Sequence, residues 1–99
     1  MKIRELKKDT KILFDHMIGD AMILAEIKND KKTVEEISKM LDEAIKKREE
    51  ILVKVNHPEL KDKETSTKKY YLELREETID YFNNFYEKLG NFLEEGETA

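Results

Sequence analysis

The stretch Asn29-Asp30-Lys31-Lys32-Thr33 separates two long segments in which apolar residues recur every three or four positions. Thr33 is followed by Val34-Glu35-Glu36, and this order predicts a capping box at the start of a helix. In such a box the Thr33 hydroxyl and the Glu36 carboxylate accept hydrogen bonds from each other's free backbone N–H groups. Because the break is so short, we expect the two flanking helices to form an antiparallel hairpin.

The periodicity on either side of this break predicts helices over about residues 3–28 and 33–56. The apolar face of the first segment covers an arc of about 180°, so this helix must contact at least two neighbours. The second segment ends at Asn56-His57-Pro58, because proline disfavours helical geometry in the residue before it. The expected apolar face of the first segment consists of Ile3, Leu6, Leu13, Met17, Leu24 and Ile27, widened by Phe14, Ile18, Ala21 and Ala25.

A third helix is predicted over about residues 66–93, with Thr65, Ser66 or Thr67 as its cap. Seven of the eight aromatic residues of the chain lie in this segment. Residues 94–99 are expected to form a disordered acidic tail, since acidic groups near a helix C-terminus are unfavourable. The sequence therefore predicts an all-α protein, an up-down-up antiparallel three-helix bundle in a single domain over residues 1–93. Dimerisation could complete or extend this bundle.

The composition narrows the classes of function. The chain has 99 residues, of which 42% are charged, and its net charge of −4 argues against a dedicated nucleic-acid binder. The absence of cysteine excludes disulfides, thiolate catalysis and cysteine-ligated metals. No apolar run is long enough for a secretory signal or a transmembrane helix, so we expect a cytoplasmic protein without a membrane partner.

A second apolar stripe lies outside the main face of the first predicted helix. Ile12, His16, Gly19 and Ile23 follow spacings of four, three and four residues. A glycine in the middle of a helix costs about 1 kcal/mol relative to alanine, so close approach of another backbone would explain it. We expect this stripe to be an interface, with a second copy or with another protein. The alternative is that the connection over residues 58–67 covers it.

The third predicted helix carries a cluster of carboxylates. Glu73 with Glu76 and Glu77 with Asp80 form an ExxE pair followed directly by an ExxD pair. This pattern resembles the Mg²⁺-binding pairs of the all-α nucleotide pyrophosphohydrolases of the MazG type, although there the pairs come from different helices. The stretch from Leu74 to Asp80 is also similar to the LRxxID stretch of small all-α chorismate mutases, which opens the first helix of that family. Those likenesses imply Mg²⁺ or an anionic substrate, but they are short, and we assign no family from them.

Three further charged residues interrupt apolar faces of the predicted helices. Arg48 and Arg75 lie at seam positions, and Asp20 lies between Met17 and Leu24. Long cationic side chains can cover apolar surface while the charge reaches water. As an alternative, we expect Asp20 to pair with Arg48 or Arg75 inside the bundle and to fix its register.

These observations predict a small non-enzymatic interaction or regulatory module that acts through a helix face, as a homodimer or with a protein partner. Exposed aromatic side chains at Tyr70, Tyr71 and Tyr81 would add to such a surface. We expect no cofactor and no resident metal. The alternative is a small all-α enzyme that binds Mg²⁺ or an anionic substrate through Arg75 and the carboxylates Glu73, Glu76, Glu77 and Asp80.

Overall fold

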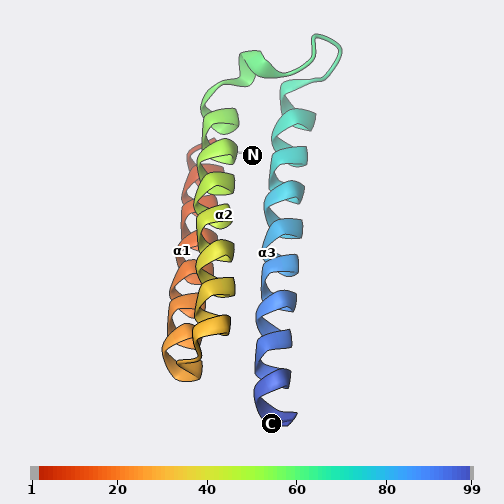
Figure 1. The fold of residues 1–99 in the computed structure, drawn as a ribbon. Helices are drawn as coiled ribbons and strands as arrows, with labels where there is room; N and C mark the ends of the chain where they lie inside the picture. The colour runs from red at the N-terminus through yellow and green to blue at the C-terminus, as the bar shows by residue number, and fades with distance from the viewer. Residues whose placement is uncertain (1–2, 99) are drawn as a thin grey trace.

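The computed structural model describes the backbone of residues 3–98 and the side chains of residues 3–93. Its elements are α1 (Ile3–Lys28), α2 (Lys31–Asn56), a 3₁₀ turn η1 (Pro58–Leu60) and α3 (Thr67–Thr98). The three α-helices pack against one another in the predicted up-down-up order, so α1 and α3 run in the same direction (Figure 1). The described chain is elongated, with extents of 52 × 20 × 18 Å. The prediction of an all-α three-helix bundle is thus confirmed.

A turn of two residues, Asn29 and Asp30, joins α1 to α2. Asn29 adopts a left-handed conformation with φ of 44°, and its N–H donates to the Ala25 carbonyl at 3.0 Å, which closes the last turn of α1. Asp30 is extended, and its carboxylate accepts a hydrogen bond from the Thr33 N–H at 3.3 Å. Asparagine and aspartate suit these two conformations better than most residues.

The predicted capping box at Thr33 is therefore wrong, and α2 begins two residues earlier, at Lys31. Asp30 caps the helix, and the Thr33 hydroxyl donates to the Asp30 carboxylate at 2.9 Å instead of accepting from the backbone. An aspartate just ahead of the helix offers a charged acceptor to the free N–H groups, so it takes the capping position from the threonine.

Apolar side chains from all three helices form one continuous core. Phe14, Met17, Ile37 and Ile51 have no solvent exposure at all. Two residues that the periodicity assigns to the same face, Ile3 and Ile27, are instead 43% and 71% exposed. The other buried apolar residues are Leu6, Ala21 and Leu24 of α1, Ala44 and Val55 of α2, and Tyr71, Leu74, Phe85 and Leu89 of α3.

Two tyrosines of α3 fasten its start to the end of α2. The last carbonyls of a helix lack partners within that helix. The Tyr70 hydroxyl donates to the Lys54 carbonyl at 2.8 Å, and the Tyr71 hydroxyl donates to the Val55 carbonyl at 3.2 Å. Tyr71 is buried and Tyr70 is half-buried, so the expectation that these aromatic side chains are exposed is wrong.

The start of α3 agrees with the sequence, whereas its end does not. The Ser66 hydroxyl accepts a hydrogen bond from the Lys69 N–H at 3.1 Å, as expected for one of the three predicted caps. At the other end, residues 94–98 continue the helix to Thr98 and do not form a disordered tail, while Ala99 lies outside the described residues. Phe92 packs against the core, so each residue beyond it extends an existing helix, which is easier than starting a new one.

The turn geometry gives a first prediction. Replacement of Asp30 by alanine removes the cap of α2 and is expected to lower the free energy of unfolding by about 1 kcal/mol. The matched control is Glu36→Ala, which removes the other half of the predicted capping box and should leave stability nearly unchanged. Urea unfolding followed by circular dichroism measures both changes. A larger loss for Glu36→Ala than for Asp30→Ala would contradict the capping seen in the structure.

Candidate functional site

The apolar stripe on α1 lies on the surface of the bundle. Ile12 and Ile23 are 42% and 56% exposed, His16 is exposed and Gly19 is half-buried. A Cβ atom added at Gly19 would have no atom of the described chain within 4 Å outside its own helical backbone and chain neighbours. Among the described residues, none therefore makes the close approach that the glycine suggested.

The connection between α2 and α3 does not cover the stripe. Leu60, Lys61, Asp62 and Thr65 of this connection line a hollow together with residues of α2 and α3. It crosses between the ends of α2 and α3 (Figure 1). This observation removes the alternative explanation that the connection shields Ile12, His16, Gly19 and Ile23 from solvent.

Ile27 extends the stripe toward the end of α1. It follows Ile23 by four residues, about one helical turn, and it is the most exposed of the large apolar residues that the structure describes. At 100° per residue Ile27 lies about 60° around the helix from the buried Leu24, which turns it away from the core. The sequence pattern placed Ile27 in the main apolar face, so this part of the exposed surface was missed.

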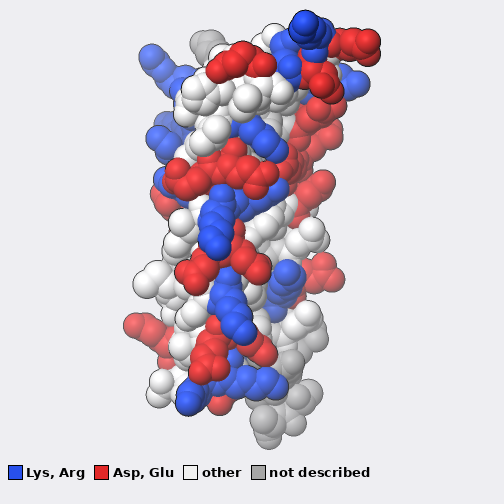
Figure 2. Space-filling view, turned by 45° about the horizontal axis from the view of Figure 1, so that its top comes forward, with Lys and Arg blue, Asp and Glu red and all other residues white. Residues whose placement is uncertain are grey.

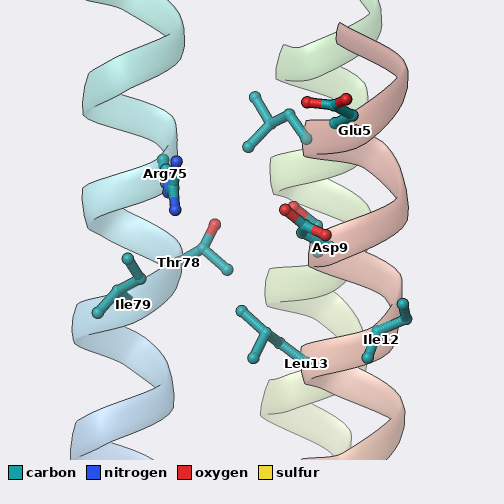
Figure 3. A pocket seen from close by; sticks show the side chains of 9 residues that line it. Glu5, Asp9, Ile12, Leu13, Arg75, Thr78 and Ile79 are labelled. Carbon is teal, nitrogen blue, oxygen red and sulfur yellow. The ribbon is translucent and has the colours of Figure 1, made fainter. Parts of the chain in front are cut away.

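A groove of about 350 Å³ lies between the first half of α1 and α3. Thr78 of α3 and Leu13 of α1 point toward each other across it (Figure 3). Arg75 stands on the α3 side, and Glu5 and Asp9 stand on the α1 side. The apolar part of the lining comes from Leu6, Ile12, Leu13 and Ile79. Ile12 thus belongs to both the stripe and the groove, so the two features form one continuous surface.

Thr10 and Thr78 are the buried polar residues beside this groove, 1% and 3% exposed. The Thr78 hydroxyl donates to the Leu74 carbonyl of its own helix at 2.8 Å. The Thr10 hydroxyl has no hydrogen-bond partner in the part of the chain that the structure describes. The periodicity of the sequence could not reveal this groove. The shape of the groove depends on how far the side chains of two different helices reach toward each other.

Asp20 does not pair with an arginine, which corrects the sequence prediction. It is exposed, and its carboxylate accepts a hydrogen bond from the Tyr86 hydroxyl of α3. Arg48 contacts its neighbour Glu49 at 3.1 Å, and Arg75 lines the groove beside Glu5 and Asp9. The rotation of α3 in the bundle brings a tyrosine to Asp20, and periodicity within one helix does not fix this rotation.

The contact with Asp20 affects the ionisation of the Tyr86 side chain. Burial, followed by the hydrogen bond to Asp20 and the Asp20 charge, raises the pKa of the Tyr86 phenol from 10.0 to about 12. A phenol beside a carboxylate keeps its proton because ionisation would place two negative charges together. The pair therefore acts as a structural link between α1 and α3.

The four carboxylates Glu73, Glu76, Glu77 and Asp80 of α3 do not form a metal site. Glu77 forms an ion pair with Lys47 of α2 at 2.5 Å, and its hydrogen bond raises the pKa of the Lys47 ammonium. Glu73, Glu76 and Asp80 border the same open hollow, which faces α2. Among the described residues, no three acidic or histidine side chains lie close enough together to hold a metal ion. Arg75 lines the other groove, so the structure separates it from the four carboxylates.

The remaining charged side chains are mixed in sign. Down the middle of the face seen in Figure 2, lysine and arginine alternate with aspartate and glutamate, whereas acidic side chains adjoin along its upper right edge. Lys54 and Glu50 on α2 are one such pair, 3.3 Å apart. Exposed pairs of this kind contribute little to stability and are typical of a solvated surface.

No family model, curated protein or solved structure matches this chain. Among the residues that the structure describes, none of the helices combines the length and the apolar character needed to cross a membrane.

The Tyr86 link gives a second prediction. A group whose pKa is raised in the folded state adds stability below its unfolded pKa, and this contribution is lost as the pH rises through the folded pKa. For Tyr86 the loss should occur between about pH 10 and about pH 12. Asp20→Asn should lower the pKa of Tyr86 but leave it above its ordinary value, because burial remains. Carbon NMR titration of the tyrosine rings measures this shift, with Tyr81 as the internal control. An unchanged pKa of Tyr86 would show that the link to Asp20 does not form in solution.

The arrangement of the carboxylates gives a third prediction. A ligand that binds only the folded state raises its melting temperature. Because Glu77 already forms an ion pair with Lys47, we expect millimolar MgCl₂ to leave the melting temperature unchanged. NaCl at the same ionic strength is the control. A saturable increase that disappears in Glu73→Gln/Glu76→Gln would restore the Mg²⁺-binding alternative.

Proposed function

We propose that this protein is a non-catalytic interaction module that forms a homodimer through one face of α1. The interacting surface is the apolar stripe of Ile12, His16, Gly19 and Ile23. The observation that carries the proposal is the exposure of this stripe on a helix whose opposite side forms the core. An interface that removes such isoleucines from water gains about 25 cal/mol for each square ångström of apolar surface buried.

The position of Gly19 is a second reason to propose this surface as the interface. The glycine is in the middle of the stripe and has open space above it. A helix tolerates a central glycine at a cost of about 1 kcal/mol, and no described residue of the chain fills the space that the missing side chain leaves. A neighbouring helix could approach closely at this point, because no Cβ atom would hold it away.

The arrangement of the charged groups favours an interaction module over the enzyme alternative. A binding site for Mg²⁺ or an anionic substrate needs several charged groups that converge in one cavity. In this chain Glu73, Glu76, Glu77 and Asp80 border the hollow toward α2, whereas Arg75 borders the groove toward α1. The proposed surface on α1 needs no such convergence.

The fourth prediction tests this surface through the mass of the protein in solution. The wild-type protein should have the mass of a dimer by light scattering, and Gly19→Arg and Ile23→Arg should have the mass of a monomer. Each arginine would place a charge in the middle of an apolar contact. Gly19→Arg should keep the helical circular dichroism spectrum, since a Cβ atom at this position meets no other part of the described structure within 4 Å.

Val53→Arg is the matched control, because Val53 is also a half-exposed β-branched residue, 49% exposed, but lies on α2. This variant should remain a dimer. A wild-type protein that stays monomeric up to millimolar concentration would overturn the proposed homodimer. A dimer that survives Gly19→Arg and Ile23→Arg would show that another surface forms it.

A further inference from the structure

Charge is distributed unevenly along α1. Its first half, residues 3–14, contains four basic and two acidic side chains, and its second half, residues 15–28, contains three acidic and one basic. Two copies of α1 placed side by side in the same direction would bring like halves together. Two copies in opposite directions would bring the basic half of each against the acidic half of the other, which lowers the electrostatic energy of the pair.

The stripe is nearly symmetric about its own middle. The midpoint between Ile12 and Ile23 lies between Met17 and Ile18. A twofold axis at this point would place Ile12 opposite Ile23 of the second copy, and His16 opposite Gly19 of the second copy. A twofold interface uses the same patch on both subunits, so a self-complementary stripe is what it requires. The imidazole of His16 would then occupy the space left free above Gly19.

The same symmetry relates Ile27 to the groove. A twofold axis at this midpoint places Ile27 at the level of Lys8 of the second copy. The α1 residues that line the groove lie between Glu5 and Leu13, on either side of this level. Ile27 is 71% exposed, and the groove offers it an apolar lining of Leu6, Ile12, Leu13 and Ile79. The most exposed large apolar side chain and the groove between α1 and α3 are thus equally far from the axis.

We infer that the groove between α1 and α3 is a docking site for Ile27 of a second copy of this chain, in an antiparallel twofold dimer. This inference depends on the proposed self-association through α1. It adds the relative direction and register of the two α1 helices and names the side chain that enters the groove. In this dimer Ile12 packs on Ile23 of the second copy, and each groove receives one isoleucine.

Lys8 and Glu26 lie 18 residues apart, about five whole turns, so they share one edge of α1. This edge brings each Lys8 beside Glu26 of the second copy.

Charge reversal along this edge is the first test and the fifth prediction. Lys8→Glu and Glu26→Lys each replace two attractive contacts per dimer with two repulsive ones. We expect each single variant to raise the dissociation constant about tenfold. The double variant Lys8→Glu/Glu26→Lys should restore the wild-type value, because it exchanges the two charges. Sedimentation equilibrium at low ionic strength measures all four proteins.

The Glu26→Lys variant also separates this contact from an effect of net charge. The chain has a net charge of −4, so Glu26→Lys lowers the overall repulsion between two copies and would strengthen a dimer held by non-specific forces. A specific contact with Lys8 predicts the opposite result. The control is Lys39→Glu, at an exposed site on α2, which should leave the dissociation constant unchanged.

Cross-linking tests the direction of the pair. The chain contains no cysteine, so a single engineered thiol reports one position. Ile12→Cys and Ile23→Cys are purified separately and treated with a short bis-maleimide, alone and as an equimolar mixture, at a concentration at which both are dimeric. The antiparallel dimer predicts cross-linking in the mixture and little with either variant alone. A parallel dimer would cross-link each variant with itself, and that result would overturn the inference.

The docking of Ile27 has its own test. Ile27→Ser and Ile79→Ser should both weaken the dimer, although Ile79 is on α3 and outside the stripe. Ile45→Ser is the matched control, because Ile45 of α2 is 48% exposed and does not line the groove. A dimer that Gly19→Arg dissociates but that is insensitive to Ile27→Ser and Ile79→Ser would overturn the docking and leave the proposed function standing. A wild-type monomer would overturn both.

Discussion

The length of one connection determines most of this structure. Asn29 and Asp30 are the only residues between two helices of 26 residues each, so α1 and α2 must lie antiparallel along their whole length. This requires a left-handed residue at the end of α1 and an extended capping residue at the start of α2, and asparagine and aspartate supply them. The hairpin then presents a long apolar surface that α3 covers, with Tyr70 and Tyr71 holding the start of α3 at the end of α2.

Much of the fold could be predicted because its main determinants are local in the sequence. Pro58 ends α2 and Ser66 caps α3, and both act within a few residues of their own positions. Local rules were wrong where two of them competed. Thr33 with Glu36 satisfies the capping-box pattern, but Asp30 is itself a preferred capping residue and stands closer to the end of α1. The acidic residues after Leu93 were expected to unwind the helix, yet the helix continues past Phe92, which packs on the core.

The candidate site was only partly predictable, because side-chain contacts between helices depend on their rotation. The stripe could be read from spacing within α1, and its members lie on the surface. The partner of Asp20 could not be read in this way, because Arg48, Arg75 and Tyr86 all lie on helices that pack beside α1. The groove lined by Arg75 is likewise formed by side chains of both α1 and α3, so the residue pattern along either helix alone does not predict the groove.

An odd number of helices has an electrical consequence for this molecule. The backbone dipole of each helix is equivalent to about half a positive charge at its N-terminus and half a negative charge at its C-terminus. The dipoles of α1 and α3 point the same way and that of α2 points the opposite way, so one helix dipole is left uncompensated in the bundle. The backbone alone therefore makes one end of this 52 Å molecule positive and the other negative. Two such molecules side by side in opposite directions cancel this field, and two in the same direction double it.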